Sequence, residues 1–174
     1  MSAFKLPLGQ LVRENLSIVL CYAYSARPLW AEILARMPGK ERFALEIFLL
    51  ADRRAQKALM ELALFLRTLD DDEGITARLR QTDTNLSCGT LYMESGMQEE
   101  LPLREVANKI IHAKSLDWRI TLRDDGDSIK EDALPTVVAI ARKHSAQTPK
   151  KYRWAEAHID LIVLGFMCSQ IKLP

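Results

Sequence analysis

Apolar residues recur at three- and four-residue intervals over most of the first half of the chain, which is the spacing of helices that bury one face. The pattern predicts helices at residues 8–24 and 41–69, and a short helix that begins near Pro28 and runs towards Met37. A break is expected at residues 25–28, because proline disrupts the interior of a helix. The helix at 41–69 is the longest predicted element. It contains neither glycine nor proline, and the face opposite its apolar side carries basic and acidic residues.

The middle of the chain has a weaker pattern. Residues 70–74 read Asp-Asp-Asp-Glu-Gly, and we expect them to form a solvated loop, because carboxylates are unfavourable at the C-terminus of a helix. A cation site is the alternative, but the run lacks the spaced ligands of a shaped loop, so no metal is expected. Residues 74–98 are rich in Thr, Ser, Asn and Gly. They predict a long loop with one short helix at 75–80.

The second half combines helical and alternating patterns. The predicted elements are a helix at 99–114, strands at 118–123 and 136–141, and a closing helix at 151–171. The acidic and glycine residues at 124–127 have the chemistry of a turn that would pair the two strands. Together the elements predict a mainly α, single-domain helical bundle spanning residues 1–174, with one small antiparallel β-hairpin before the last helix.

Composition narrows the class of protein. The chain has 174 residues, 48% of them apolar, and a formal charge of +1, which permits a sizeable core and excludes a globally basic nucleic-acid coat. The longest apolar run, Leu161–Cys168, is far shorter than the ~20 residues that span a bilayer. The start of the chain lacks the pattern of a secretory signal. We therefore expect a cytoplasmic protein with no membrane partner.

Cysteine and histidine positions give no support for a cofactor. The three cysteines, Cys21, Cys88 and Cys168, are widely separated, and no CxxC pair is present. The expected state is free thiols in a reducing compartment, with neither zinc nor another cofactor.

One segment, residues 103–113, carries a pattern that suggests chemistry. On a helix its apolar residues fall on one side, and Glu105, Asn108 and His112 form a polar line along the edge of that side. Such a line is consistent with a structural role, in which Asn108 and His112 hydrogen-bond to each other or to a neighbouring helix. It is also consistent with a functional site, in which these side chains take part in chemistry. In either case the two stacked side chains are expected to behave alike.

The sequence Asn-Lys-Ile-Ile-His-Ala, residues 108–113, resembles the motif helix of HEPN domains. These are small helical modules, many of them homodimeric RNA-cleaving toxins, defence nucleases or companions of nucleotidyltransferases. The usual motif is an arginine, four to six residues, and a histidine, commonly with a polar residue directly after the arginine. Asn108 matches the polar position and His112 the histidine.

The arginine of that motif has no counterpart, because none of the residues at 105–107 is basic. In the chemistry that the resemblance implies, the histidine helps to activate a ribose 2′-hydroxyl and the arginine stabilises charge on the scissile phosphate. Arg104, Lys109 or a cation from a partner subunit would then have to replace it. The resemblance therefore implies a catalytic set of His112, Asn108 and Arg104 in a homodimer.

A basic segment near the end of the chain suggests RNA as a partner. Five cations lie within twelve residues that contain no acid: Arg142, Lys143, Lys150, Lys151 and Arg153. Beside Tyr152 and Trp154 they have the composition of a phosphate-binding and base-stacking loop. A solvated loop is the alternative, and Trp154 is expected to pack into the core.

Two functions are consistent with these features. One is metal-independent RNA cleavage or RNA binding in a defence or toxin setting. The other is a non-catalytic helical interaction module that binds a protein partner.

Overall fold

The computed structural model describes residues 7–37, 39–81, 87–122 and 133–171. The chain is mainly α, but it also contains a five-stranded antiparallel sheet with strand order β2-β1-β5-β4-β3. The helices are α1 (Leu8–Arg36), α2 (Glu41–Glu73), α3 (Ile75–Gln81), α4 (Leu103–His112) and α5 (Leu161–Ser169). The strands are β1 (Gly89–Met93), β2 (Gln98–Glu100), β3 (Ala113–Leu122), β4 (Ala133–Ala141) and β5 (Trp154–Asp160), with a short 3₁₀ helix, η1 (Lys150–Tyr152), before β5.

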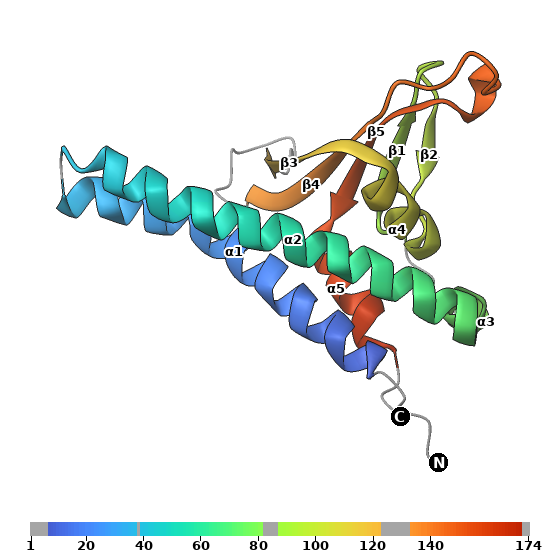
Figure 1. Ribbon diagram of the computed structural model, residues 1–174, viewed down its shortest axis with the longest axis horizontal. Helices are drawn as coiled ribbons and strands as arrows, with labels where there is room; N and C mark the ends of the chain where they lie inside the picture. The colour runs from blue at the N-terminus through green and yellow to red at the C-terminus, as the bar shows by residue number, and fades with distance from the viewer. Residues whose placement is uncertain (1–6, 38, 82–86, 123–132, 172–174) are drawn as a thin grey trace, which may run out of the picture.

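The two longest helices, α1 and α2, lie side by side as an antiparallel hairpin (Figure 1). The predicted break at residues 25–28 is wrong, because α1 continues through Pro28 as one helix of 29 residues. A proline removes one backbone hydrogen bond, and packing along α2 outweighs that loss. The expected loop at residues 70–73 is also wrong. These residues form the last turn of α2, which ends at Gly74 in the left-handed conformation (φ 62°).

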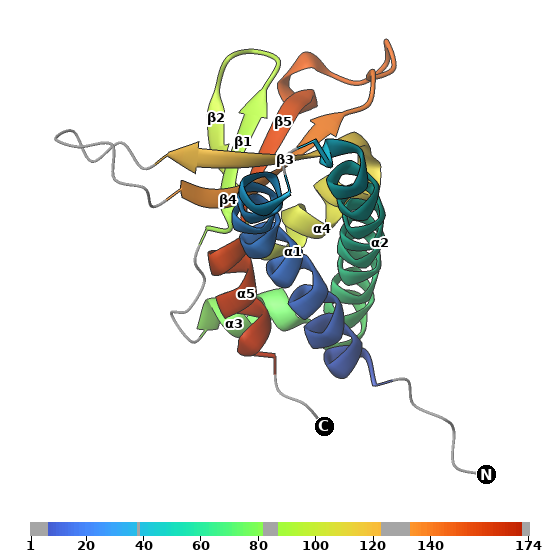
Figure 2. The same cartoon turned by 90° about the vertical axis from the view of Figure 1, so that its left-hand side faces the viewer.

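The predicted strand pair is confirmed as β3 and β4, which pair antiparallel with Trp118 opposite Val137. Both strands extend beyond the predicted ranges, and they belong to a larger sheet rather than to an isolated hairpin. The predicted turn at 124–127 lies outside the described residues. The sheet is twisted, and β1 and β2 run in a clearly different direction from β3 in Figure 2.

The predicted closing helix at 151–171 is wrong in its first half. Residues 154–160 form β5, which lies between β1 and β4 in the sheet. Trp154, Ala157 and Ile159 are buried. A strand in the centre of a sheet can be rich in buried apolar residues, and such a strand is easily mistaken for part of an apolar helix. The helix begins only after Asp160, whose Oδ1 accepts hydrogen bonds from the backbone N–H groups of Ile162 and Val163, at 2.8 and 3.0 Å.

The long loop predicted at 74–98 instead contains regular secondary structure. The short helix expected at 75–80 is confirmed as α3, and β1 and β2 form a hairpin that the sequence pattern did not predict. Gly89 begins β1 where the backbone passes very close to β5. A Cβ placed there would lie 1.9 Å from the carbonyl oxygen of His158. Only glycine fits that contact.

The buried apolar side chains form one core between the helices and the sheet. Fully buried members come from α1, α2, α4, β5 and α5: Val12, Leu59, Ile110, Ile159 and Leu164. Helix α4 lies between α2 and the sheet, in contact with both. None of the helices in the described part of the chain is long and apolar enough to cross a membrane.

Candidate functional site

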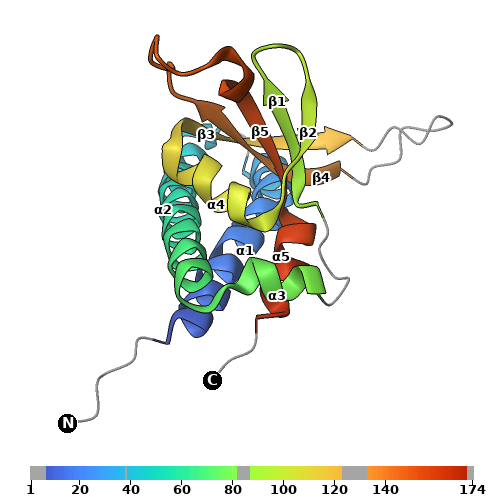
Figure 3. The same cartoon turned by 90° about the vertical axis from the view of Figure 1, so that its right-hand side faces the viewer.

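Helix α4, which carries the motif residues, packs beside the C-terminal half of α2 (Figure 3). The two helices are antiparallel, since Arg104 at the start of α4 pairs with Asp70 and Asn108 one turn later contacts Arg67. The next turn of α4 ends at His112. The polar line predicted on α4 therefore lies along its boundary with α2.

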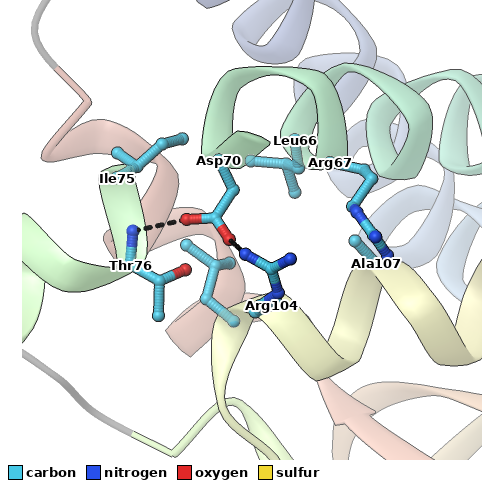
Figure 4. A pocket seen from close by; sticks show the side chains of 8 residues that line it. Leu66, Arg67, Asp70, Ile75, Thr76, Arg104 and Ala107 are labelled. Carbon is cyan, nitrogen blue, oxygen red and sulfur yellow. Dashed lines mark hydrogen bonds and ion pairs between the residues drawn. The ribbon is translucent and has the colours of Figure 1, made fainter. Parts of the chain in front are cut away.

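At the start of α4, a buried carboxylate joins three helices. Asp70 is only 7% exposed. Its Oδ1 accepts the backbone N–H of Thr76 at 2.8 Å, and its Oδ2 accepts Arg104 Nη1 at 2.5 Å (Figure 4). Burial alone would raise the pKa of Asp70, but the hydrogen bonds from Thr76 and Arg104 outweigh it and lower the pKa below its ordinary value of 3.8. The cavity beside these groups is about 10 Å³, roughly the volume for one water probe.

From Asp70 a continuous set of polar contacts extends along α4. Arg104 also donates to Asp71 at 3.1 Å, and Asp71 accepts Arg67 Nε at 2.8 Å. Arg67 Nη1 in turn donates to Asn108 Oδ1. We call this set, together with Asp70 and Glu105, the α2–α4 polar network.

On its other side Asn108 donates from Nδ2 to Glu105 Oε1 at 3.1 Å. Lys109 Nζ donates to the second oxygen of Glu105 at 2.9 Å and lies 5.4 Å from the centre of the Trp154 ring. Burial would raise the pKa of Glu105, but the hydrogen bonds from Lys109 and Asn108 lower it. Every polar side chain in this part of α4 therefore has a partner.

The hydrogen bonds of the α2–α4 polar network show which basic side chain contacts the polar line of α4. Arg104 is eight residues before His112, about 12 Å along the helix, and its guanidinium is held by Asp70 and Asp71. Arg67, on α2, is the guanidinium that contacts Asn108. Sequence reasoning missed Arg67 because it is 41 residues away from Asn108 and is only one of several charged residues on the polar face of its helix.

His112, the last residue of α4, differs from Asn108. It is exposed, and within the described part of the chain its side chain makes no hydrogen bond or ion pair. Residues four apart on a helix lie on roughly the same side of it, and His112 is one turn beyond Asn108 along α4. The expectation that Asn108 and His112 behave alike is not supported by their surroundings, because only Asn108 is tied into the network.

Between α2 and the start of β3 lies a groove of about 370 Å³, whose lining includes Ile110 and Ala113 but not His112. Three cations line it: Arg53 and Lys57 from α2, and Lys114 from β3. Among the described residues Arg53 and Lys114 form no ion pair, whereas Lys57 lies 3.6 Å from Glu61. We call the surface lined by Arg53, Lys57 and Lys114 the basic groove.

The carboxylate of Asp52, one residue before Arg53, is occupied elsewhere. It accepts Trp118 Nε1 at 2.6 Å and Gln56 Nε2 at 2.9 Å. Trp118 also packs edge-on against Tyr22, with ring centres 5.0 Å apart. Burial and the nearby Asp52 raise the pKa of Tyr22 to about 12. This cluster joins α1, α2 and β3, and it fixes the two sides of the basic groove relative to each other.

The basic segment predicted to bind RNA lies in the connection between the neighbouring strands β4 and β5. Arg142, just beyond the end of β4, donates to the backbone oxygen of Ala113 at 3.1 Å, so it lies beside the end of α4. Arg153 donates to the backbone oxygens of Thr148 and Ala146, at 2.8 and 3.2 Å, and therefore holds its own loop together. Both of these arginines therefore donate hydrogen bonds to backbone oxygens.

The other three cations of that segment are Lys143, Lys150 and Lys151. Lys143 is exposed, and the side chain of Lys150 lies outside the described part. Lys151 lies 4.8 Å from the ring centre of Tyr152 in a second groove, which also contains Glu99, Glu100 and Glu105. These carboxylates disfavour phosphate there. Trp154 is buried in the core, as expected.

None of the three cysteines forms a disulfide. Cys88 is buried, and burial raises the pKa of its thiol to about 12, so it has no character of a nucleophile. In the ranges that the structure describes, no group of three His, Cys, Asp or Glu side chains is placed to hold a metal ion.

No family model, curated protein or solved structure matches this chain.

Proposed function

We propose that the chain binds RNA through its phosphate backbone at the basic groove. The observation that supports this is the set of three cations, from Arg53, Lys57 and Lys114, around one concave surface. Two of them lack an ion-pair partner in the described part of the chain. Phosphate oxygens are the ligands that such cations neutralise, and the release of condensed counterions then favours binding. Arg142, beside Ala113 at the end of α4, extends the positive charge towards β4.

RNA cleavage is the finer form of the proposal, and it rests on His112. His112 is exposed and directly precedes Ala113, which lines the groove, so its imidazole is our candidate for exchanging a proton with a ribose 2′-hydroxyl. Arg67 contacts Asn108 of the motif through its guanidinium, and it replaces Arg104 as our candidate for the missing cation. The five-stranded sheet is not part of the helical bundle that a HEPN resemblance implies, so the proposal depends on the groove and not on the family.

The direct test is the binding of a fluorescent single-stranded RNA, followed by anisotropy over a range of salt concentrations. Arg53→Ala with Lys114→Ala is expected to weaken binding roughly tenfold and to reduce the salt slope by about 0.7 for each phosphate that is no longer neutralised. Arg78→Ala is the matched control, because Arg78 is an exposed arginine on α3 that pairs with Glu73. Equal losses of affinity in the control and the double variant would contradict a specific groove.

Cleavage is tested by incubating the protein with total RNA, with and without a chelator. Activity that resists the chelator and disappears in His112→Ala supports the metal-independent mechanism. RNA binding without cleavage would leave a non-catalytic RNA-binding protein. An absence of both would favour the alternative, a module that binds a protein partner in the cytoplasm.

A further inference from the structure

The second groove, of about 750 Å³, lies between the β1–β2 hairpin, the start of α4 and η1. We call it the hairpin groove. Its volume lies within the range of roughly 300–1,000 Å³ that is usual for ligand sites in proteins. Among the described residues it shares no lining residue with the basic groove, so the two grooves are separate surfaces.

Apolar side chains form much of the hairpin groove. Leu91 and Met93 of β1 line it and are only 6% and 8% exposed, so they form its floor. Met97 and Tyr152 also line it but are 60% and 62% exposed. Large apolar side chains around a concave surface are typical of a binding site, and methionine adapts its shape to different apolar partners.

The charged side chains of the hairpin groove leave an excess of negative charge. Lys109 is neutralised by Glu105, since Lys109 Nζ lies 2.9 Å from Glu105 Oε2. Glu99 and Glu100 are exposed and form no ion pair within the described part of the chain. Lys151 is the remaining cation among the described lining residues. Two unpaired carboxylates against one ammonium group favour a cationic ligand.

The strand register separates these charges along the groove. Met93 pairs with Trp154, so η1, which directly precedes β5, lies beside the turn of the β1–β2 hairpin (Figure 1). Glu100 pairs with Thr90, three residues before Met93, which corresponds to about 10 Å along β1. The cation of η1 therefore lies near the hairpin turn, and the unpaired carboxylates lie towards α4.

Strand β2 favours an extended peptide as the ligand. It is an edge strand of the described sheet, in which only β1 pairs with it. An edge strand has backbone N–H and C=O groups on its outer side that an extended peptide can pair with, while alternate side chains of the peptide enter a neighbouring groove. A second copy of β2 is disfavoured, because Glu99 and Glu100 would then face like charges across the strand pair.

We propose that the hairpin groove binds an extended, basic peptide segment of another protein. Apolar side chains of the segment contact Met93, Met97 and Tyr152. A lysine or arginine of the segment pairs with Glu99 or Glu100, about three residues away, because three residues of an extended chain span about 10 Å. The proposal does not rest on RNA binding, since the basic groove is a separate surface.

Selection from a random peptide library displayed on phage, against the full chain, tests the proposal. The enriched peptides should carry a lysine or arginine about three residues from an apolar side chain, and acidic peptides should be depleted. A fluorescent synthetic copy of an enriched peptide should bind the full chain in an anisotropy titration, with an affinity that falls as the salt concentration rises. No enrichment over an empty surface, or enrichment of acidic peptides, would overturn the proposal.

Variants of the hairpin locate the binding. Glu99→Gln with Glu100→Gln is expected to weaken binding of the synthetic peptide roughly tenfold, because two exposed ion pairs are lost. Glu94→Gln is the matched control, since Glu94 is an exposed glutamate of the same hairpin that does not line the groove. Its affinity should equal that of the wild type. Equal affinities in the double variant and the control would overturn the proposal.

Two further measurements keep the result independent of variant folding and of RNA. If the double variant loses the circular dichroism of the wild type, the wild type is titrated with a peptide whose basic residue is replaced by glutamine, and the same tenfold loss is expected. Arg53→Ala with Lys114→Ala should leave peptide affinity unchanged. Displacement of the peptide by single-stranded RNA would overturn the proposal, because the hairpin groove would then be part of the RNA surface.

Discussion

The polar side chains at the two ends of α4 differ in whether they are paired. At its start, Arg104, Glu105, Asn108 and Lys109 are all paired with one another or with α2. At its end, His112 is unpaired within the described chain, and Lys114 just beyond it has no ion pair there. The difference comes from α2, which carries Asp70 and Asp71 beside the first end, and Arg53 and Lys57 beside the second.

This difference separates stability from binding on one short helix. A paired polar network lowers the free energy of the folded state and offers little to a ligand, because its donors and acceptors are already satisfied. An unpaired cation at the surface contributes little to folding and keeps its full charge for an anion. We therefore expect substitutions at the start of α4 to change stability and substitutions at its end to change binding.

The largest expected effect is that of Arg104→Ala on stability. The substitution leaves the buried carboxylate of Asp70 with only the hydrogen bonds from Thr76, and an under-satisfied buried charge costs roughly 1–3 kcal/mol or more. Urea denaturation should show a lower midpoint with an unchanged slope. Arg78→Ala removes an exposed ion pair with Glu73 and should cost less than about 1 kcal/mol. Equal midpoints for the two variants would mean that Asp70 does not depend on Arg104.

The same carboxylate predicts how stability depends on pH. Because the pKa of Asp70 is lower in the folded protein than its ordinary value of 3.8, its contribution is fully present above pH 3.8. It is lost as the pH falls through the lowered folded value, since the unfolded chain then binds the proton more tightly. Glu105, whose ordinary value is 4.5 and whose pKa is also lowered, adds a loss in the same direction.

A pH series of urea unfolding curves checks this dependence. The wild type should lose stability on acidification below pH 4.5, whereas Asp70→Asn should start less stable and show a smaller loss over the same range. Parallel curves for the two proteins would contradict the assignment of the acid sensitivity to Asp70.

The contrast along α4 was only partly predictable from the sequence. The apolar stripe of α4 and the polar line of Glu105, Asn108 and His112 follow from helical periodicity alone, which is a local property. Which member of the line is paired depends on Arg67 and Asp70, both on a helix far away in the sequence. A single sequence does not show which residues of two helices lie opposite each other. Asn108 and His112 therefore have the same expected role in the sequence, although only Asn108 has a partner on α2.

The errors in the fold have a related cause. The interior of α1 at Pro28 and the strand β5 both go against the local pattern, and each is stabilised by a distant partner: α2 for the first, β1 and β4 for the second. Asp160 is the local signal for the boundary between β5 and α5. An aspartate directly before an apolar run is a typical N-cap, and it marks the start of α5 within what was predicted as one helix.

A smaller effect on stability is expected for Asn108→Ala. The substitution removes the acceptor for Arg67 and the donor to Glu105, two partly buried hydrogen bonds that contribute roughly 0.5–1.5 kcal/mol each. The thermal midpoint should fall by a few degrees. The double variant Asn108→Ala, Arg67→Ala should be less destabilised than the sum of the single variants, because both single changes break the same hydrogen bond. Strict additivity would contradict that hydrogen bond.

The smallest effect on stability is expected for His112→Ala, four residues further along the same helix. The imidazole is exposed and makes no hydrogen bond within the described chain, so the free energy of unfolding should change by less than about 0.5 kcal/mol. Affinity for single-stranded RNA should nevertheless fall, or cleavage disappear, if the end of α4 belongs to the basic groove. Asn108→Ala should show the reverse, a loss of stability with RNA affinity retained in the folded protein. Together the two variants would show whether one end of α4 contributes to stability and the other to RNA binding. A large loss of stability in His112→Ala would contradict this difference, because it would show that the end of α4 also contributes to stability.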